Sequence, residues 1–408
     1  MSAPAAPPLS LTALLQPPGL TDPAALYQRL HAEDPIHWDE ALNAWIVVRH
    51  DDLMTLLQDP RISSARIMPA LARVPAEQRE ELRPIYERLA KQIMFTDPPD
   101  HTRLRALMNR AFTARRMEAL RPVVQSIVDG LLDRVQDAGQ MDLIRDLAYP
   151  LPATVIGDLL GVPRSDQDQF KKWSGDFVIF LGNSRVAPER IAEALRGVAA
   201  FIEYFRGLVA EHRAHPQDDL IGALSSAEEQ GAMFDEDELF ANCMFVLAAG
   251  HETTTNLIAN GLLLLLQRPD QRAALARDPS LIQGLVEEVL RYESPIRAMG
   301  RIVVADLEIG GKQLRQGQAL FLMMGAANRD PDRYAAPDVF DLARHEARHI
   351  AFGHGPHFCL GAPLARIEGQ IAISTVLRRL PTLRLADDAP VWDANILFRG
   401  LKTLPVLF

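Results

Sequence analysis

Cys359 lies in a glycine-rich turn just ahead of a predicted helix. Gly353, Gly355 and Gly361 let the backbone adopt positive φ angles and approach a flat group closely. Pro363 suits the first turn of a helix, whose N–H groups and dipole lower a thiol pKa and favour a thiolate metal ligand. We therefore predict a thiolate here, against the ordinary alternative of a small buried cysteine.

The residues around this thiol make the prediction more specific. Six positions within ten residues form the pattern: Phe352, Gly353, Gly355, His357, Cys359 and Gly361. This pattern resembles the haem-binding loop of the cytochrome P-450 superfamily. The resemblance implies that haem b is the cofactor, that Cys359 is its axial metal ligand, and that thiolate donation favours cleavage of the O–O bond. It also implies cofactor contacts for Phe352, Gly353 and Gly361.

A second polar motif interrupts an apolar segment at Ala249 to Thr254. Asp235 and Glu238 form a predicted N-terminal capping pair, and a helix from there to Pro269 has about 33 residues and is roughly 50 Å long. Glycine inside a helix costs about 1 kcal/mol relative to alanine, so Gly250 indicates a packing or functional reason. For an isolated Glu-Thr pair, a solvated turn with a back-bonded threonine is the ordinary interpretation.

The same segment resembles the family's oxygen-activation motif, in which the helix is locally distorted over the haem. The resemblance implies that Ala249 and Gly250 contact the cofactor. It also implies that Glu252 and Thr253 are the acid–alcohol pair that relays protons to dioxygen.

A bound haem would bring two propionates, which need hydrogen-bond donors. Each hydrogen bond to a charged group contributes roughly 1.5–3 kcal/mol, and basic residues are the candidate donors. His101 and Arg105 share a predicted helix face with Met108, which is also compatible with a solvated helix end. By resemblance, His101, Arg105, Arg301 and His357 are the propionate contacts.

Glu288 and Arg291 stand three residues apart on a predicted helix, which alone indicates a weak surface ion pair. They resemble the family's Glu-x-x-Arg pair, which Arg344 completes as a structural triad behind the cysteine loop. We expect these three residues to be scaffold rather than catalytic.

The resemblance also places a substrate pocket, although core packing is the default for aliphatic side chains. The expected lining includes parts of residues 177–181 together with Ile296, Arg297, Met299, Ile396 and Leu397. We expect Arg297 to turn outward to solvent, because isolated buried charges are costly.

Periodicity predicts a mainly α protein with a small β portion, in one domain over residues 1–408, with a proline-rich, irregular start at 1–20 and a long central helix. Expected helices include 23–33 and 51–58, and most of 120–266 is helical. Expected strands are 36–38, 44–49, 301–309 and 319–323, with Gly310-Gly311 as the turn between the last two.

Composition excludes several classes of protein. The net charge of -10, from 43 Lys+Arg and 53 Asp+Glu, gives no support for nucleic-acid binding. Cys243 and Cys359 are the only cysteines, so a disulfide framework is excluded and a reducing cytoplasm is expected. The apolar segment 244–266 contains His251 and Glu252, which favours a buried helix over a membrane anchor.

The motifs occur in the family's order along nearly the whole chain. The resemblance therefore implies a monooxygenase that inserts one atom of O2 into an apolar small molecule by hydroxylation or epoxidation, with electrons from a separate ferredoxin- or flavodoxin-type donor and its reductase. Three alternatives stay open: a peroxide-driven hydroxylase, a non-catalytic haem sensor, and a zinc-binding module. The last would use Cys359 with His349, His354 and His357.

Overall fold

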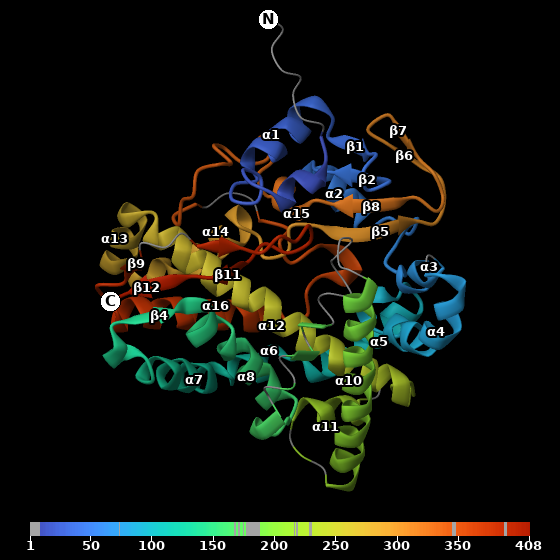
Figure 1. The fold of residues 1–408 in the computed structure, drawn as a ribbon, viewed down its shortest axis with the longest axis horizontal. Helices are drawn as coiled ribbons and strands as arrows, with labels where there is room; N and C mark the ends of the chain where they lie inside the picture. The colour runs from blue at the N-terminus through green and yellow to red at the C-terminus, as the bar shows by residue number, and fades with distance from the viewer. Residues whose placement is uncertain are drawn as a thin grey trace, which may run out of the picture.

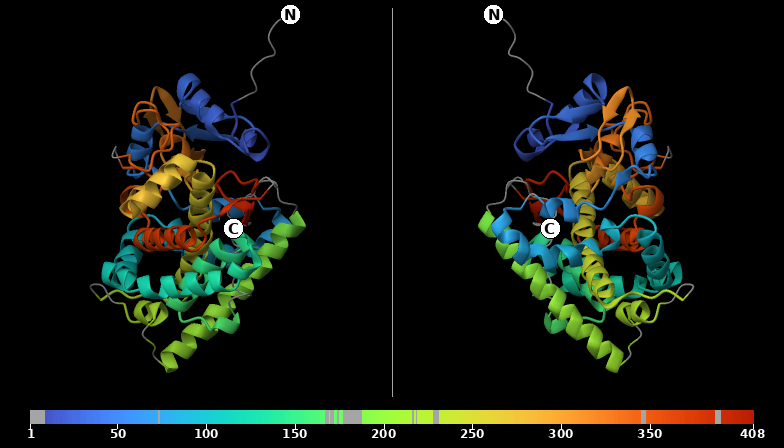
Figure 2. Two further views of the ribbon diagram at one scale, coloured as in Figure 1. Left: turned by 90° about the vertical axis from the view of Figure 1, so that its left-hand side faces the viewer. Right: turned by 90° about the vertical axis from the view of Figure 1, so that its right-hand side faces the viewer.

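The protein is described by a computed structural model that covers residues 9–72, 74–166, 169, 172–173, 175–176, 188–215, 217, 219–227, 231–344, 348–386 and 390–408. Helices make up most of these residues and the strands form small sheets, so the predicted fold class is confirmed. In Figures 1 and 2 the largest sheet lies at one end of the molecule, and helices α10 and α11 lie at the other.

The helical part contains long helices and several single turns. The α-helices are α1 (Ala24–Glu33), α2 (His50–Leu56), α3 (Ile67–Leu71), α4 (Ala76–Ala90), α5 (Asp100–Ala111), α6 (Ala114–Glu118), α7 (Arg121–Asp133), α8 (Pro150–Leu159), α10 (Pro188–Ala214), α11 (Leu220–Ser225), α12 (Glu236–Leu266), α13 (Pro269–Arg277), α14 (Ile282–Tyr292), α15 (Met324–Ala327) and α16 (Ala362–Arg379). The 3-10 turns are η1 (Leu11–Leu15), η2 (Ile93–Phe95), η3 (Gln136–Ala138), η5 (Arg164–Asp166), η6 (Pro279–Leu281) and η7 (Gly355–His357), and η4 (Ile144–Ala148) is a π turn.

The strands form one five-stranded sheet and three smaller ones. The large sheet has the order β1-β2-β8-β5-β3 and joins β1 (Ile36–Asp39), β2 (Ala44–Val47), β3 (Ile62–Ser63), β5 (Met299–Val303) and β8 (Ala319–Leu322). The others join β4 (Gln140–Asp142), β12 (Pro405–Leu407) and β9 (Arg384–Leu385); β10 (Val391–Trp392) and β11 (Leu401–Thr403); and β6 (Leu307–Ile309) and β7 (Lys312–Leu314). Only the β2–β8 pair is parallel among them.

One strand prediction is wrong. The expected strand 301–309 is two strands, β5 and β6, and Gly310-Gly311 turns the chain from β6 into β7 instead of leading to β8. Both glycines have positive φ, at 53° and 76°, which explains why the turn signal itself is correct. The strand at 312–314 has little apolar character, so the sequence pattern gives no sign of it.

The long helix α12 crosses the middle of the molecule (Figure 1) and is almost entirely buried along its C-terminal half. Its capping box forms as predicted: the Asp235 side chain accepts from Glu238 N–H, and the Glu238 side chain accepts from Asp235 N–H. The expected local distortion is absent, because α12 is continuous α-helix through residues 249–254. The cofactor site therefore faces a regular helix surface in this structure.

The proline-rich start contains more structure than expected. Residues 11–15 form η1, and the Ser10 side chain and the Leu11 N–H donate hydrogen bonds to buried Asp39 on β1. Leu11 and Leu14 are fully buried in a small apolar cluster with α1. None of the helices in the described parts of the chain has the length and apolar character needed to span a bilayer.

Candidate active site: a thiol and a threonine across an apolar cavity

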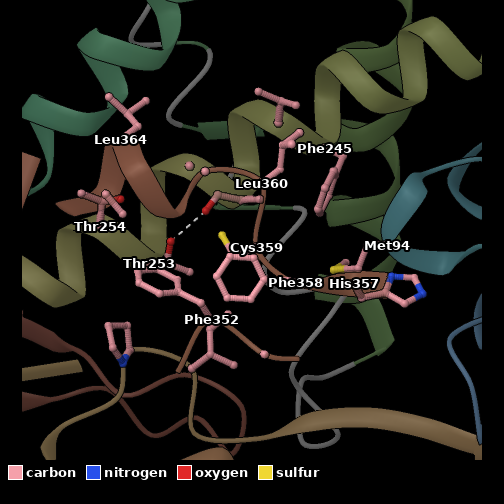
Figure 3. Close-up of a pocket in the computed structure, with 18 of the residues that line it drawn as sticks. Met94, Phe245, Thr253, Thr254, Phe352, His357, Phe358, Cys359, Leu360 and Leu364 are labelled. Carbon is pink, nitrogen blue, oxygen red and sulfur yellow. Dashed lines mark hydrogen bonds between the residues drawn. The ribbon is translucent and has the colours of Figure 1, made fainter. Parts of the chain in front are cut away.

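A cavity of about 260 Å³ lies between α12 and the loop that carries Cys359. Figure 3 shows the Cys359 sulfur directed into this cavity, with Phe352, Phe358 and Leu360 around it and Thr253 of α12 on its wall. The structure thus brings together two motifs that are about a hundred residues apart in sequence. Most of the remaining lining is aliphatic or aromatic.

The cysteine loop is held by its own backbone. Cys359 N–H donates to Phe352 O at 2.9 Å, and Gly353 N–H donates to Ile350 O at 2.8 Å. Gly353 and Gly355 have φ angles of 72° and 71°, which only glycine adopts without strain. The expectation of positive φ is wrong for Gly361, whose φ is -82° at the start of α16.

The predicted lowering of the Cys359 pKa is also wrong for the metal-free thiol. Desolvation raises this pKa, and it outweighs the N–H groups of Gly361 and Ala362 and the positive charge of Arg105, which lower it. A thiol that coordinates a metal ion is deprotonated by the metal itself. The loop therefore supplies a site for a thiolate, and the ionisation requires the bound metal.

Five basic residues gather beside the loop, and we call them the arginine–histidine cluster: Arg66, His101, Arg105, Arg301 and His357. The His101 and His357 rings are in contact, with 3.9 Å between centroids and an interplanar angle of 41°. Desolvation and neighbouring charges lower the pKa of His101, and the same causes bring the pKa of His357 to about 3. Both imidazoles are therefore neutral near pH 7, and the charge of the cluster comes from its arginines.

Within the described residues, no member of the cluster forms an ion pair with a carboxylate. Arg301 donates only to Gly300 O, at 2.9 Å, and Arg105 donates to Phe358 O, at 2.7 Å. The buried Nε2 atom of His101 has no hydrogen-bond partner. Burial lowers the pKa of Arg301 to about 10. Unneutralised buried cations are costly, so the cluster fits a group that brings carboxylates.

Of the predicted acid–alcohol pair on α12, Thr253 lines the cavity and Glu252 does not. Thr253 lines the cavity with Ala249 and Gly250, and its hydroxyl donates to Ala249 O at 2.8 Å (Figure 3). Glu252 does not line the cavity, and the Asn256 side chain acts to lower the pKa of its carboxyl group. Burial, with the charge of Asp393, raises the pKa of Glu252 to about 7. The acid is thus poised to hold or release a proton near neutral pH.

The three expected scaffold residues meet behind the loop. Arg291 donates two hydrogen bonds to Glu288, at 2.7 and 2.8 Å, and Arg344 donates a third, at 3.3 Å. The Nη atoms of Arg291 also donate to the carbonyl oxygens of Asn328, Pro337 and Val339. Glu288 and Arg291 are both buried, so this is no surface ion pair.

The substrate-pocket expectations are only partly met. Ile296 and Met299 line the cavity, but Arg297, Ile396 and Leu397 do not. Ile396 packs in the N-terminal apolar cluster, and the next residue to line the cavity is Phe398. Residues 177–181 lie outside the described residues.

The expectation that Arg297 faces solvent is wrong. It is 1% exposed, and its Nε donates to Phe398 O at 3.1 Å. Tyr27 and Glu293, which come from separate elements, act to raise its pKa, but burial lowers it more strongly. The two Nη atoms are buried without a hydrogen-bond partner among the described residues, so Arg297 is a buried charge that is only partly compensated.

Several residues in or beside the cavity were not predicted from the sequence. Phe245 precedes Ala249 and Thr253 by four and eight residues, so helical spacing was a signal for it. Arg66 is one of several arginines between residues 61 and 88, and nothing in this segment connected it to Arg301. Glu368 lines the cavity from α16, and burial raises its pKa well above the usual value.

The zinc alternative is not supported. No group of three or more His, Cys, Asp or Glu residues suited to a metal ion occurs among the described residues. His349 bonds Glu287 at 3.2 Å, and His357 bonds the Ser64 hydroxyl at 3.2 Å. The one thiol in an apolar cavity beside unpaired arginines fits haem instead, with Cys359 at the metal and the cluster at the propionates.

Comparison with known proteins gives the same result. The family model for cytochrome P450 matches residues 75–393. The chain is 43% identical over 389 residues to cytochrome P450 107B1 of Saccharopolyspora erythraea, with 93% of each chain covered, and 42% identical over 398 residues to the monooxygenase PikC of Streptomyces venezuelae, with 94% of this chain and 91% of PikC covered. The crystal structure of a myxobacterial cytochrome P450, CYP267B1, in complex with myristic acid has a TM-score of 0.87 and 41% identity, and the match covers 97% of this chain and 98% of that one. The chain therefore belongs to the cytochrome P450 family of haem-binding monooxygenases, which are oxidoreductases that use O2 and electrons from redox partners.

Proposed function

We propose that this protein inserts one oxygen atom of O2 into an apolar small molecule, by hydroxylation or epoxidation, in the cytoplasm. The second oxygen atom leaves as water, with two electrons from a ferredoxin- or flavodoxin-type donor and its reductase and two protons from solvent. The observation that carries the proposal is the placement of Cys359 and Thr253 on the walls of one largely apolar cavity.

The cavity composition supports an apolar substrate. Its ionisable residues are Glu368, the cysteine and four members of the arginine–histidine cluster. The α12 side is lined by Phe245, Val246 and Ala249, and the sheet side contributes Ile296 and Met299. A charged substrate group near α12 has no partner of opposite charge there, and burying it unpaired is costly.

When bound, haem supplies the activation of dioxygen and the oxygen transfer. Cys359 would hold the metal from the loop side, and the propionates would be held by Arg105, Arg301, His101 and His357. A substrate in the remaining cavity would then meet the α12 residues that line it.

The proton path uses two neighbouring residues of α12. Thr253 donates its hydroxyl proton to Ala249 O, which leaves its two lone pairs as acceptors for a donor in the cavity. Glu252 lies outside the cavity lining, and burial lets its carboxyl group keep a proton up to a pKa of about 7. A proton passes inward by rotation of the Glu252 side chain or through a water molecule to the Thr253 hydroxyl.

The test of this path is Thr253→Ala. We expect the variant to consume electrons with O2 but to divert at least half of them to hydrogen peroxide instead of hydroxylated product. Product and peroxide are quantified per electron pair consumed. Thr253→Ser keeps the hydroxyl and serves as the matched control. Unchanged coupling in Thr253→Ala contradicts the role assigned to Thr253.

The substrate class is tested separately. A carbon-monoxide difference spectrum of the reduced protein reports thiolate ligation, and shifts of the haem spectrum across terpenoid, fatty-acid, aromatic and macrolide ligands report binding. We expect long-chain neutral molecules to give the largest shifts. Tight binding restricted to dianionic ligands would contradict an apolar substrate.

A further inference from the structure

Arg66 lies directly before α3 and close to Arg301, and its guanidinium group has few partners among the described residues. Its Nη1 atom donates to Gly300 O at 3.0 Å, and the group lies over the Phe95 ring at 4.8 Å from the centroid. Among the described residues this is the one hydrogen bond of the Arg66 side chain, and it has no ion pair. Burial, with the charge of Arg301, lowers its pKa to about 9.

Arg66 and Arg301 converge on one atom. Both donate to the carbonyl oxygen of Gly300, at 3.0 and 2.9 Å. Two guanidinium groups that share one acceptor repel each other unless an anion neutralises them. Asp97 is the nearby acid, and its charge acts to raise the pKa of Arg301, but its carboxylate accepts from the Ser63 hydroxyl and from Ser64 N–H and forms no ion pair with either arginine among the described residues. Two arginines beside one acid leave this site short of negative charge, which a carboxylate of the cofactor would supply.

The position of Arg66 in the chain links this site to the α3–α4 segment, which leads to the cavity wall at η2. Arg66 is the N-cap residue of α3, and Phe95 follows α4, the next helix. The contact between Arg66 and Phe95 therefore joins the two ends of the α3–α4 segment. Ile93 and Met94, at the end of this segment, line the cavity.

We propose that Arg66 is a fifth donor to the haem propionates and that, through it, the bound cofactor fastens the α3–α4 segment, whose end lines the cavity. Arg66 is a positioning residue in this role. The proposal depends on haem binding and not on the identity of the substrate, so failure of the substrate assignment leaves it intact.

The test is the rate of haem loss from the Arg66→Met holoenzyme to an excess of apomyoglobin. One lost hydrogen bond to a charged group predicts roughly tenfold faster loss than in the wild type. Arg83→Met is the matched control, because Arg83 lies on the same segment and pairs with Glu80 at the surface. Its rate is expected to equal that of the wild type.

Haem dimethyl ester distinguishes a propionate contact from a general packing effect. With the ester, wild type and Arg66→Met are expected to lose the cofactor at equal rates, and Arg66→Lys is expected to recover part of the difference with ordinary haem. An equal acceleration with haem and with its ester would overturn the proposal, as would an unchanged rate with haem.

Hydrogen exchange tests the fastening of the segment. In the holoenzyme, amides of residues 67–90 are expected to exchange several-fold faster in Arg66→Met, and to match wild type loaded with the ester. Exchange at α16 serves as the internal reference. Protection of 67–90 that is the same in all three samples, wild type with haem, Arg66→Met with haem and wild type with the ester, would refute the coupling. A carbon-monoxide difference spectrum verifies that thiolate ligation survives in each variant.

Discussion

The scaffold triad and the arginine–histidine cluster are both groups of buried charge, and they are built differently. In the scaffold triad, Glu288 accepts from Arg291 and Arg344, and carbonyl oxygens take the remaining donors. In the arginine–histidine cluster, Arg66 and Arg301 share one carbonyl oxygen and no carboxylate pairs with them among the described residues. A charge network that is complete in the protein alone stabilises the fold, whereas an incomplete one is a binding site for the missing charge.

The largest loss of unfolding free energy is expected when the scaffold triad is broken. Arg291→Met leaves the buried Glu288 carboxylate without its bidentate partner, which costs roughly 3–5 kcal/mol of unfolding free energy. Chemical denaturation, with and without haem, measures the loss. We expect it in both forms, because the triad does not touch the cofactor. A loss confined to the haem-bound form would place the triad in the binding site.

The same substitution in the cluster is expected to act differently. Arg301→Met weakens the haem-bound form by roughly 1.5–3 kcal/mol, the contribution of a hydrogen bond to a charged group. It leaves the haem-free form as stable as the wild type or more stable, because it removes a buried cation without a counterion. Denaturation of both forms by urea gives the two numbers. Equal destabilisation with and without haem would show that the two networks are alike.

The smallest effect concerns an acid that belongs to neither network. Because the pKa of Glu252 is raised to about 7, the carboxyl group is protonated below that pH and loses its proton above it. We expect the fraction of electrons that form product to fall as the pH rises through 7. In Glu252→Gln we expect this pH dependence to disappear. The overall rate of product formation is expected to be lower than in the wild type. An inflection retained in the variant would assign it to another group.

The raised pKa of Glu252 also makes the stability of the folded protein depend on pH. The unfolded carboxyl group ionises near its ordinary pKa of 4.5, while the folded one keeps its proton to about 7. The contribution of Glu252 to stability is therefore greatest below pH 4.5, declines between there and about 7, and is then constant. Glu252→Gln is expected to remove this part of the decline.

Local sequence patterns predicted the parts of the fold and the site that depend on neighbours in the chain. The capping box of α12 and the turn at Gly353 follow from residues a few positions apart. The approach of Arg66 to Arg301, and the burial of Arg297 beside Tyr27 and Glu293, depend on elements more than two hundred residues apart or on tertiary packing. No periodicity in one segment contains that information.

Two other errors have a common physical cause. The helix start at Cys359 was expected to lower the thiol pKa, but the apolar cavity raises it more strongly. Ile396 and Leu397 were placed in the cavity, but the chain turns so that Phe398 faces it. In both cases the chain segment was identified correctly. The surrounding tertiary structure then determined the pKa of the thiol and which side chain lines the cavity.

The pairing of distant strands also determines when this molecule can fold during synthesis. Trp45 on β2 bonds Gln318 beside β8, 273 residues later, and Arg399 bonds the backbone of Leu20 and Thr21. The β1–β2 hairpin therefore emerges from the ribosome long before its partner strands exist. Until they do, it has exposed apolar side chains and an open edge, which are the features that chaperones recognise and that promote aggregation.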